Sequence, residues 1–429
     1  MDIALSDYLA ALDYLFARTT GTFKFGLERT RTLLAALGDP HLAYPVLHIA
    51  GTNGKGSSVA TAEALLRAKG LTVARYTSPH LVDFRERIVV DGVPIPEAEV
   101  VAFIEAFTPT VERIGASFFE ATTALALLHF AKSGVDVALV ETGLGGRLDS
   151  TNVVAPRAAG VTSIGFDHME YLGPTLRDIA SEKAGIFKRG APAVIGEPDA
   201  EIRRFLTDAA TRAGASHVHV TADEMEIADV VVSTTGTRFR LRAFDTEQVI
   251  ETPLVGRHQA ANFAFTLGLL DAAGDPFRVS LPEAAESVRA VRLPGRFQRV
   301  GRWVFDVAHN PDGARTLAAS LRSVAHEAPV TALLCVLADK DWRAMIDELA
   351  TVADRFIITS APTAPVSRAW TMSEVLDYTS ARGHQAIVIS DFDAALEAAR
   401  QMDGTVVVTG SFHTVGDAMQ RLQVSPFTG

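Results

Sequence analysis

The sequence predicts an α/β protein with an N-terminal doubly wound, mostly parallel sheet that carries a P-loop, followed by a smaller Rossmann-like α/β domain. Continuous apolar runs alternate with helical stretches along most of the 429 residues, which is typical of parallel strands buried on both faces. A glycine-rich turn joins an early apolar run to a helix. The alternation restarts after the segment LPGR, so we expect domains at residues 1–295 and 296–429.

Composition limits the class of protein and its partners. Apolar residues make up 48% of the chain and charged residues 21%, which suits a globular protein with a large core. The formal charge of −11 argues against a nucleic-acid surface, because phosphate backbones require a basic stripe. No apolar run is long enough for a membrane span, and residues 1–16 lack the basic start of a signal peptide. Cys335 is the single cysteine. We expect a cytoplasmic protein with no nucleic-acid and no membrane partner.

The stretch PVLHIAGTNGKGSSVATAEALLRAK, residues 45–69, organises the chain. Residues 46–50 predict a buried strand and residues 58–69 a helix. The turn between them consists of Gly51, Thr52, Asn53, Gly54, Lys55, Gly56 and Ser57. Glycines let successive N–H groups point at one anion, while the helix N-terminus and Lys55 add positive charge. The generic P-loop pattern is not strictly met, because Gly56 separates Lys55 from Ser57. A plain turn with a solvated Lys55 is the alternative, and we favour nucleotide binding.

Polar residues also follow other predicted strands, at the edge where parallel sheets bind ligands. The strand at 72–76 leads to Ser78 and His80, and the run 135–140 ends in Glu141, followed by three glycines. A third strand, 158–165, leads to Asp167 and His168. An acid near a phosphate loop commonly orders magnesium. On their own, Ser78 and His80 fit a turn residue and a solvated histidine.

The remaining segments complete the expected architecture. Residues 1–44 predict one or two helices, with Phe23 and Phe25 as a hydrophobic staple instead of a pocket lining. Residues 175–188 predict a helix on which Lys183 is by default a surface cation. Residues 215–250 suggest a small antiparallel excursion, and residues 254–274 return to helix. In the second series, a strand ends in Asp306 and His309, a helix starts at Pro311, and the last of four further strands leads into Ser411.

Together these motifs resemble the folylpolyglutamate synthase / dihydrofolate synthase family, within the Mur-ligase superfamily. The matching segments run in order from about residue 23 to residue 415 and are GTNGKGS, TSPHL, ETGLGGRLDSTN, IGFDH, LGPTLRDIASEKAGIFK, GRHQAANF, LPGRF, DVAHNPDGA, DKDW and TGS. The resemblance implies an ATP-dependent ligase that adds L-glutamate to dihydropteroate or a reduced folate through an acyl phosphate. ADP and phosphate would be released, and two magnesium ions would be needed.

The same resemblance implies roles for individual residues. For ATP it implies Gly51, Thr52, Asn53, Gly54, Lys55, Gly56, Ser57, Asn262, Arg296 and Asp306. For magnesium it implies Ser57, Ser78, Glu141 and His168. For catalysis it implies Lys55, His168, Lys183 and His309. Lys183 also matches a lysine that is carbamylated in related enzymes. For the pteridine substrate it implies Phe119 and Asp149, and for the incoming amino acid Ser411.

Two other functions stay open. A Mur-type ligase that joins an amino acid to a UDP-N-acetylmuramoyl peptide shares the nucleotide chemistry, but the TSPHL and GKGS segments speak against it. A nucleotide-dependent switch without synthetic activity would not need a second α/β domain and a metal-ligand set. Within the resembled family, we expect a bifunctional enzyme that uses both acceptors, and a monomer.

Overall fold

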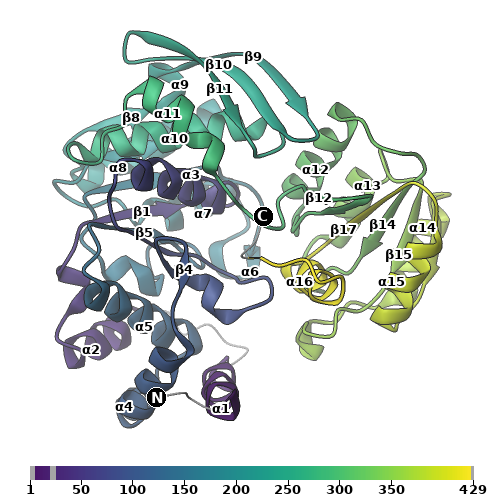
Figure 1. Ribbon diagram of the computed structural model, residues 1–429, viewed down its shortest axis with the longest axis horizontal. Helices are drawn as coiled ribbons and strands as arrows, with labels where there is room; N and C mark the ends of the chain where they lie inside the picture. Colours follow the sequence, from purple (N-terminus) through teal and green to yellow (C-terminus); the bar gives the residue numbers. More distant parts are fainter. Residues whose placement is uncertain (1–4, 20–25, 427–429) are drawn as a thin grey trace.

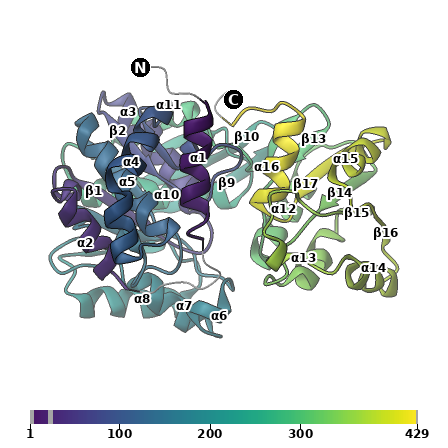
Figure 2. The same cartoon turned by 90° about the horizontal axis from the view of Figure 1, so that it is seen from below.

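The computed structural model describes residues 5–19 and 26–426, and it contains the two predicted α/β units side by side (Figures 1 and 2). The proposed staple at Phe23 and Phe25 lies outside the described residues. A sheet of eight strands forms the first unit and a sheet of six strands the second, and a three-stranded sheet lies above the first unit near the top of Figure 1, with one end reaching toward the second. We call these parts the N-terminal unit, the C-terminal unit and the small sheet.

The eight-stranded sheet has the order β4-β3-β2-β5-β1-β6-β7-β8. Its strands are β1 (Val46–Ala50), β2 (Val73–Tyr76), β3 (Ile88–Val90), β4 (Val93–Pro94), β5 (Val137–Glu141), β6 (Ala158–Val161), β7 (Ala193–Ile195) and β8 (Val218–Val220). The six neighbouring strands β2, β5, β1, β6, β7 and β8 run parallel, whereas β3 and β4 form an antiparallel edge beside β2. All five residues of β1 are buried, as expected for the centre of a sheet with helices on both faces.

Helices cover both faces of this sheet. Since successive side chains of β1 point to opposite faces, they contribute to two cores. Leu47 and Ile49 join the core shared with α3 and α10, whereas Val46 and Ala50 face the opposite layer. The first layer consists of α3 (Lys55–Ala68), α10 (His258–Ala273) and α11 (Leu281–Ser287). The opposite layer consists of α1 (Leu5–Phe16), α2 (Glu28–Ala36), α4 (Glu97–Ile114), α5 (Phe118–Ser133), α7 (Leu176–Ala184) and α8 (Ala200–Ala213). Two single turns, α6 (Met169–Leu172) and α9 (Thr221–Glu224), complete the unit.

The small sheet is the predicted antiparallel excursion. It consists of β9 (Glu226–Ser233), β10 (Gly236–Ala243) and β11 (Thr246–Thr252), in the order β11-β10-β9. Phe239 on β10 packs edge-on against Phe263 of α10, with ring centroids 5.7 Å apart. The sheet therefore closes the core around α10. Within the predicted range, β8 is different, because it pairs in parallel with β7 of the large sheet.

The C-terminal unit is a six-stranded sheet of order β12-β13-β17-β14-β15-β16, antiparallel only at β12. Its strands are β12 (Gln298–Val300), β13 (Trp303–Phe305), β14 (Val330–Leu334), β15 (Arg355–Ile358), β16 (Gln385–Val388) and β17 (Thr405–Thr409). Its helices are α12 (Pro311–Ser323), α13 (Trp342–Leu349), α14 (Met372–Ala381), α15 (Phe392–Gln401) and α16 (Phe412–Arg421). In Figure 2, α12 and α16 lie on the side that faces the N-terminal unit.

Several element boundaries differ from those predicted. The helix α3 begins at Lys55, three residues before the predicted start, because the turn Gly51 to Gly54 is completed earlier. The helix α7 ends at Ala184, because Gly185 lies against the backbone of Arg147 and the chain turns there. The elements α4, α8, β3 and β4 were not predicted. Over the described ranges, no helix is both long and apolar enough to cross a membrane.

Candidate functional site

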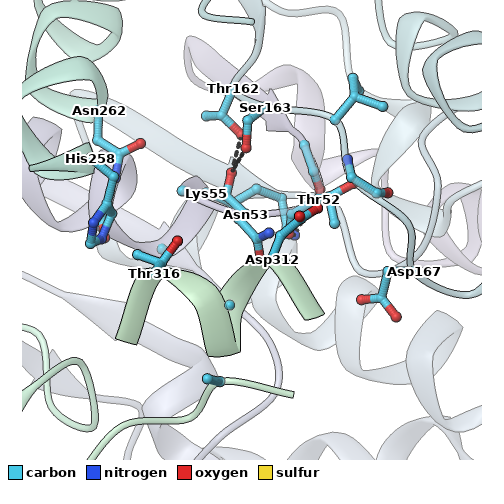
Figure 3. Close-up of a pocket in the computed structure, with 18 of the residues that line it drawn as sticks. Thr52, Asn53, Lys55, Thr162, Ser163, Asp167, His258, Asn262, Asp312 and Thr316 are labelled. Carbon is cyan, nitrogen blue, oxygen red and sulfur yellow. Dashed lines mark hydrogen bonds between the residues drawn. The ribbon is translucent and has the colours of Figure 1, made fainter. Parts of the chain in front are cut away.

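A cavity of about 720 Å³ lies between the two units, at the carboxyl ends of β1, β5 and β6. The N-terminal unit contributes the turn 51–57, the residues after these strands and one end of α10. The C-terminal unit contributes Arg296, Asp306, His309, Phe412 and part of α12. In Figure 3, Asp312 and Thr316 on α12 face the turn that carries Asn53 and Lys55. The cavity therefore depends on both units.

The turn 51–57 has the conformation of an anion-binding loop. Gly51 has φ of 154° and Gly54 has φ of 92°, a region that favours glycine. A Cβ on Gly51 would lie 1.8 Å from Thr162 Oγ1, and one on Gly54 would lie 2.5 Å from Asn262 Oδ1. Both glycines are therefore also required by close packing. The loop leads directly into α3, a helix of 14 residues whose N-terminus attracts anions.

Lys55 is the first residue of α3 and lies inside this loop, so the alternative of a solvated lysine is wrong. Its side chain is 15% exposed. Its Nζ donates to the carbonyl oxygens of Gly51 at 2.9 Å and Thr52 at 3.2 Å, and it lies 3.7 Å from Glu141 Oε1. The ammonium group is thus held at the mouth of the loop, where phosphate oxygens would be neutralised.

Oxygen groups suited to a hard cation meet at the end of β5. Glu141 is 5% exposed, and burial raises its pKa, while the charges of Lys55 and Arg296 act in the opposite direction. Ser57 and Ser78 line the same cavity. Among the described residues, no three histidine, cysteine or acidic side chains form a metal-binding group. The predicted set of one carboxylate, hydroxyls and one histidine fits magnesium, because that ion retains several waters.

His80 is not the solvated histidine that the turn suggested. Its Nδ1 accepts a hydrogen bond from Arg87 Nε at 2.8 Å. Burial, together with the charge of Arg87, lowers the pKa of His80 to about 2. The histidine therefore stays neutral and fixes the loop that carries Ser78.

Lys183 is buried and is not the surface cation that its position on a predicted helix suggested. It is 5% exposed, and its Nζ donates to the carbonyl oxygen of Gly51 at 2.9 Å. Burial lowers its pKa to about 7, with a smaller contribution from the charge of Lys55. The amine is therefore partly neutral near physiological pH, which is rare for a lysine.

His168 and its neighbour Asp167 line the same cavity from the loop that follows β6. His168 has φ of 51°, in the left-handed region, at the start of α6. Burial lowers its pKa to about 3, and the charge of Lys340 adds to this shift. Lys340 Nζ donates to His168 Nε2 at 3.1 Å. The imidazole is therefore neutral, as a metal ligand must be.

The C-terminal unit places the other predicted nucleotide contacts along the cavity. Arg296 lies 5.2 Å from the ring centroid of Phe412, and burial lowers its pKa against the charges of Asp306 and Glu141. Asp306 accepts hydrogen bonds from two backbone N–H groups. Asn262 lines the cavity from α10 beside His258 (Figure 3).

Three predicted substrate residues do not line this cavity. Phe119 packs beside Gly143, where a Cβ would lie 2.3 Å from its ring. The Asp149 carboxylate accepts hydrogen bonds from the backbone N–H groups of Gly143, Leu144 and Thr151, so it holds its own loop in place. Ser411 is 2% exposed and caps α16. Their roles toward a substrate stay predictions.

Other residues of the site were not singled out from the sequence. They are His258, which lines the cavity, and Asn310 and Lys340, which contact Asp167; Asp167 itself was named only beside His168, after the third predicted strand. Lys340 belongs to the DKDW segment, one of the segments that carry the family resemblance, but the resemblance implied no role for this lysine. Its distance of 173 positions from Asp167 explains why sequence reasoning could not pair them.

Two family descriptions match the chain over most of its length. The Mur ligase middle domain matches residues 49–270, and the Mur ligase glutamate ligase domain matches residues 295–412. The dihydrofolate synthase/folylpolyglutamate synthase of Escherichia coli (strain K12) is 35% identical over 430 residues, covering 97% of this chain and 96% of that protein.

Solved structures give the same result for the fold. An Escherichia coli protein in complex with DHPP and ADP superimposes with a TM-score of 0.86 at 33% identity, covering 99% of each chain. A bifunctional folylpolyglutamate synthase/dihydrofolate synthase with Mn, AMPPNP and L-glutamate bound has a TM-score of 0.84 at 32% identity. It covers 98% of this chain and 99% of the other.

Proposed function

The chain belongs to the folylpolyglutamate synthase/dihydrofolate synthase family of Mur ligases, which are ATP-dependent ligases, and we propose that it joins L-glutamate to dihydropteroate and to reduced folates. The observation that supports this most is the cavity between the units, where the anion-binding loop faces Arg296 and His309. The DHPP, nucleotide and L-glutamate complexes of the related structures agree with these three kinds of substrate.

The reaction needs ATP for a chemical reason. A carboxylate does not condense with an amine at neutral pH, because the oxygen that must leave is a poor leaving group. Transfer of the γ-phosphoryl group to the acceptor carboxylate gives an acyl phosphate and ADP. The amine of L-glutamate then attacks the acyl carbon, and phosphate leaves as the amide forms. Phosphoryl transfer mainly requires positioning and neutralisation of charge.

Charges on both sides of the cavity suit this reaction. The N–H groups of residues 51–57 and the ammonium of Lys55 would hold the phosphates, and Arg296 would neutralise the transferred group from the other unit. By resemblance, Asn262 would contact adenine and Asp306 the ribose. His309 would lie near the phosphates. Since the two sides belong to different units, closure around ATP would assemble the site.

Magnesium would be held by oxygen groups of the N-terminal unit. Ser57, Ser78 and Glu141 line the cavity together, and neutral His168 could complete the predicted set. When bound, the metal would neutralise phosphate charge. We propose two such ions. The Mn ion in a related complex is consistent with a divalent metal here.

We also propose that Lys183 is carbamylated. An amine reacts with CO2 only when it is neutral, and burial keeps part of the Lys183 population neutral near pH 7. The product carries a negative charge in place of a positive one. Such an anion could support the second magnesium.

The substrate range, location and assembly complete the proposal. We propose a bifunctional enzyme that uses both acceptors, is cytoplasmic and acts as a monomer, with domains divided near Gly295. The start of the six-stranded sheet at Gln298 is consistent with that boundary.

The decisive experiment measures ATP- and magnesium-dependent incorporation of labelled L-glutamate, with dihydropteroate and tetrahydrofolate as parallel acceptors. Products from both acceptors, with one ADP and one phosphate per amide, are expected. A product from tetrahydrofolate alone would reduce the function to tail extension. No product from either acceptor, with ATP still bound, would overturn the proposal and leave the Mur-type alternative.

A further inference from the structure

Asp167 is a buried carboxylate to which the proposed mechanism assigns no role. It lies in the loop between β6 and α6 of the N-terminal unit, and its side chain is 9% exposed. Three side chains of the C-terminal unit contact it. Lys340 Nζ donates to Oδ1 at 2.5 Å, Asn310 Nδ2 donates to Oδ2 at 3.4 Å, and His309 Nε2 lies 3.5 Å from Oδ2. One carboxylate therefore joins the two units.

The partners of Asp167 are themselves close to the proposed reaction. Lys340 is 6% exposed and also contacts His168 Nε2, so it lies between a carboxylate and a proposed metal ligand. The backbone N–H of His168 donates to Asp167 Oδ1 at 2.9 Å. Asp167 thus fixes the orientation of both the lysine and the histidine.

The contact extends to the anion-binding loop. Asn310 Nδ2 donates to Asn53 Oδ1 at 3.3 Å, and Asn310 Oδ1 caps α12 by accepting a hydrogen bond from the backbone N–H of Gly313 at 2.8 Å. The N-terminus of α12, the loop at Asn53 and the loop at Asp167 therefore meet at one corner of the cavity. Figure 3 shows Asp167 on one side of this corner and Asp312 of α12 between it and His258.

Because the side chains of Asp167 and Lys340 are shielded from solvent, the contact between the units depends on both of them. An exposed ion pair would be screened by water and would hold the units only loosely. Asp167 and Lys340 are both nearly excluded from solvent, so removing either leaves an unpaired buried charge. Ion pairs such as Asp347 with Arg382, at 3.1 Å, lie within the C-terminal unit and are about half exposed.

We propose that Asp167 is a positioning residue that holds the two units in the reactive arrangement and orients Lys340 and His309 toward the cavity. This inference rests on the proposed ligase function for its kinetic consequence, but its structural consequence is independent of that function. It assigns to Asp167 no contact with a reacting atom.

The kinetic test compares Asp167→Asn, Lys340→Met and the double variant with the wild-type protein. Asp167→Asn is expected to lower kcat by about 10- to 100-fold, because small misplacements of aligned groups have effects of this size. The KM for ATP should change by less than about threefold, since the anion-binding loop is retained. The double variant should be no slower than the slower single variant, as expected for residues that act together. Asp347→Asn, the matched control, should retain the wild-type kcat.

The structural test measures backbone hydrogen exchange in the same variants without substrate. In Asp167→Asn, exchange should become faster both at residues 164–172 and at residues 305–313, and Asp347→Asn should change neither segment. Unchanged exchange, a kcat within twofold of wild type, or multiplying effects in the double variant would each overturn the proposal. If Asp167→Asn does not fold, Lys340→Met tests the same junction. Absence of ligase activity in the wild-type protein would overturn the proposed function, while exchange would still decide the junction.

Discussion

Two lysines at the same cavity differ in chemistry because their surroundings differ. Lys55 remains 15% exposed, and its Nζ lies 3.7 Å from Glu141 Oε1. Lys183 is buried, contacts a single carbonyl oxygen and has its pKa lowered to about 7. The first is suited to phosphate binding and the second to reaction as a neutral amine. The sequence shows both as lysines near glycines, and only burial separates them.

Lys55→Ala should abolish most of the activity without unfolding the protein. In the proposed reaction the ammonium would neutralise phosphate charge in a partly buried site, where removing one such group costs about 10²- to 10³-fold in kcat. The measurement is kcat for glutamate incorporation, with circular dichroism as the check on folding. Lys132→Ala, at an exposed position near the end of α5, is the control and should keep wild-type turnover. A folded, fully active Lys55→Ala protein would contradict the assignment of the phosphate loop.

Carbamylation of Lys183 should increase with pH between 6 and 8. With a folded-state pKa of about 7, the neutral fraction rises from about one tenth at pH 6 to about nine tenths at pH 8. Labelling with ¹³C-bicarbonate should give a carbamate resonance in the NMR spectrum that grows over this range. The resonance should be missing from Lys183→Arg, because a guanidinium stays protonated. A spectrum without the resonance at every pH would eliminate the modification.

At the scale of elements, the prediction succeeded where hydrophobic patterns were continuous. The strands β1, β5 and β17 were located because their sequences are continuous, mostly apolar runs, and all their residues are buried in the structure. The edge strands β3 and β4 contain only three and two residues, which is too short for a pattern. The predicted start of α3 was three residues too late, because Gly56 in its first turn resembles a loop residue.

The predicted site followed the same rule. Ser78, Glu141 and His168 lie at or beyond the carboxyl ends of β2, β5 and β6, so their convergence at one sheet edge could be predicted. Asp167 was noticed only as a neighbour of His168, because its partners Asn310 and Lys340 come from another sheet. No local pattern encodes such contacts. Burial of Lys183 likewise depends on the loop around Gly146, which packs against the backbone of α7 at Glu182 and Lys183.

Gly146→Ala should disturb the site through the element that carries Lys183. A Cβ at position 146 would lie 2.8 Å from the carbonyl oxygen of Glu182 and 2.9 Å from that of Lys183, both backbone atoms of α7. The backbone must move, which we expect to cost about 1–3 kcal/mol of unfolding free energy. Displacement of Lys183 should lower kcat as well.

Denaturant unfolding and kcat test this prediction, with Gly268→Ala as the control. Gly268 lies within α10, and its added Cβ would come no closer than 3.3 Å to a methyl group of Thr221. Alanine is the better helix former there, so stability should be equal or higher. Equal stability and turnover in Gly146→Ala would show that the loop and α7 are not tightly packed.

At the scale of the whole molecule, the cavity divides the proposed nucleotide contacts between two units. The loop 51–57 belongs to the N-terminal unit, whereas Arg296 and Asp306 follow the predicted boundary at Gly295. A ligand that contacts both units stabilises their contact as well as each unit. Nucleotide binding should therefore be detectable in the stability of the entire protein.

Magnesium with ATP should raise the thermal unfolding midpoint, and Arg296→Ala should reduce that rise. Ligand at about 100 times its dissociation constant stabilises the native state by about 2.7 kcal/mol. Loss of a guanidinium that faces Glu141 and Asp306 should weaken binding by about tenfold, or ~1.4 kcal/mol, so the ligand-induced stabilisation should fall by about half. Differential scanning calorimetry of each protein with and without ATP measures the effect.

Arg382→Ala removes a guanidinium that stacks on Tyr378 within the C-terminal unit, and it should retain the full shift. A full shift in Arg296→Ala would mean that nucleotide binding depends on the N-terminal unit alone.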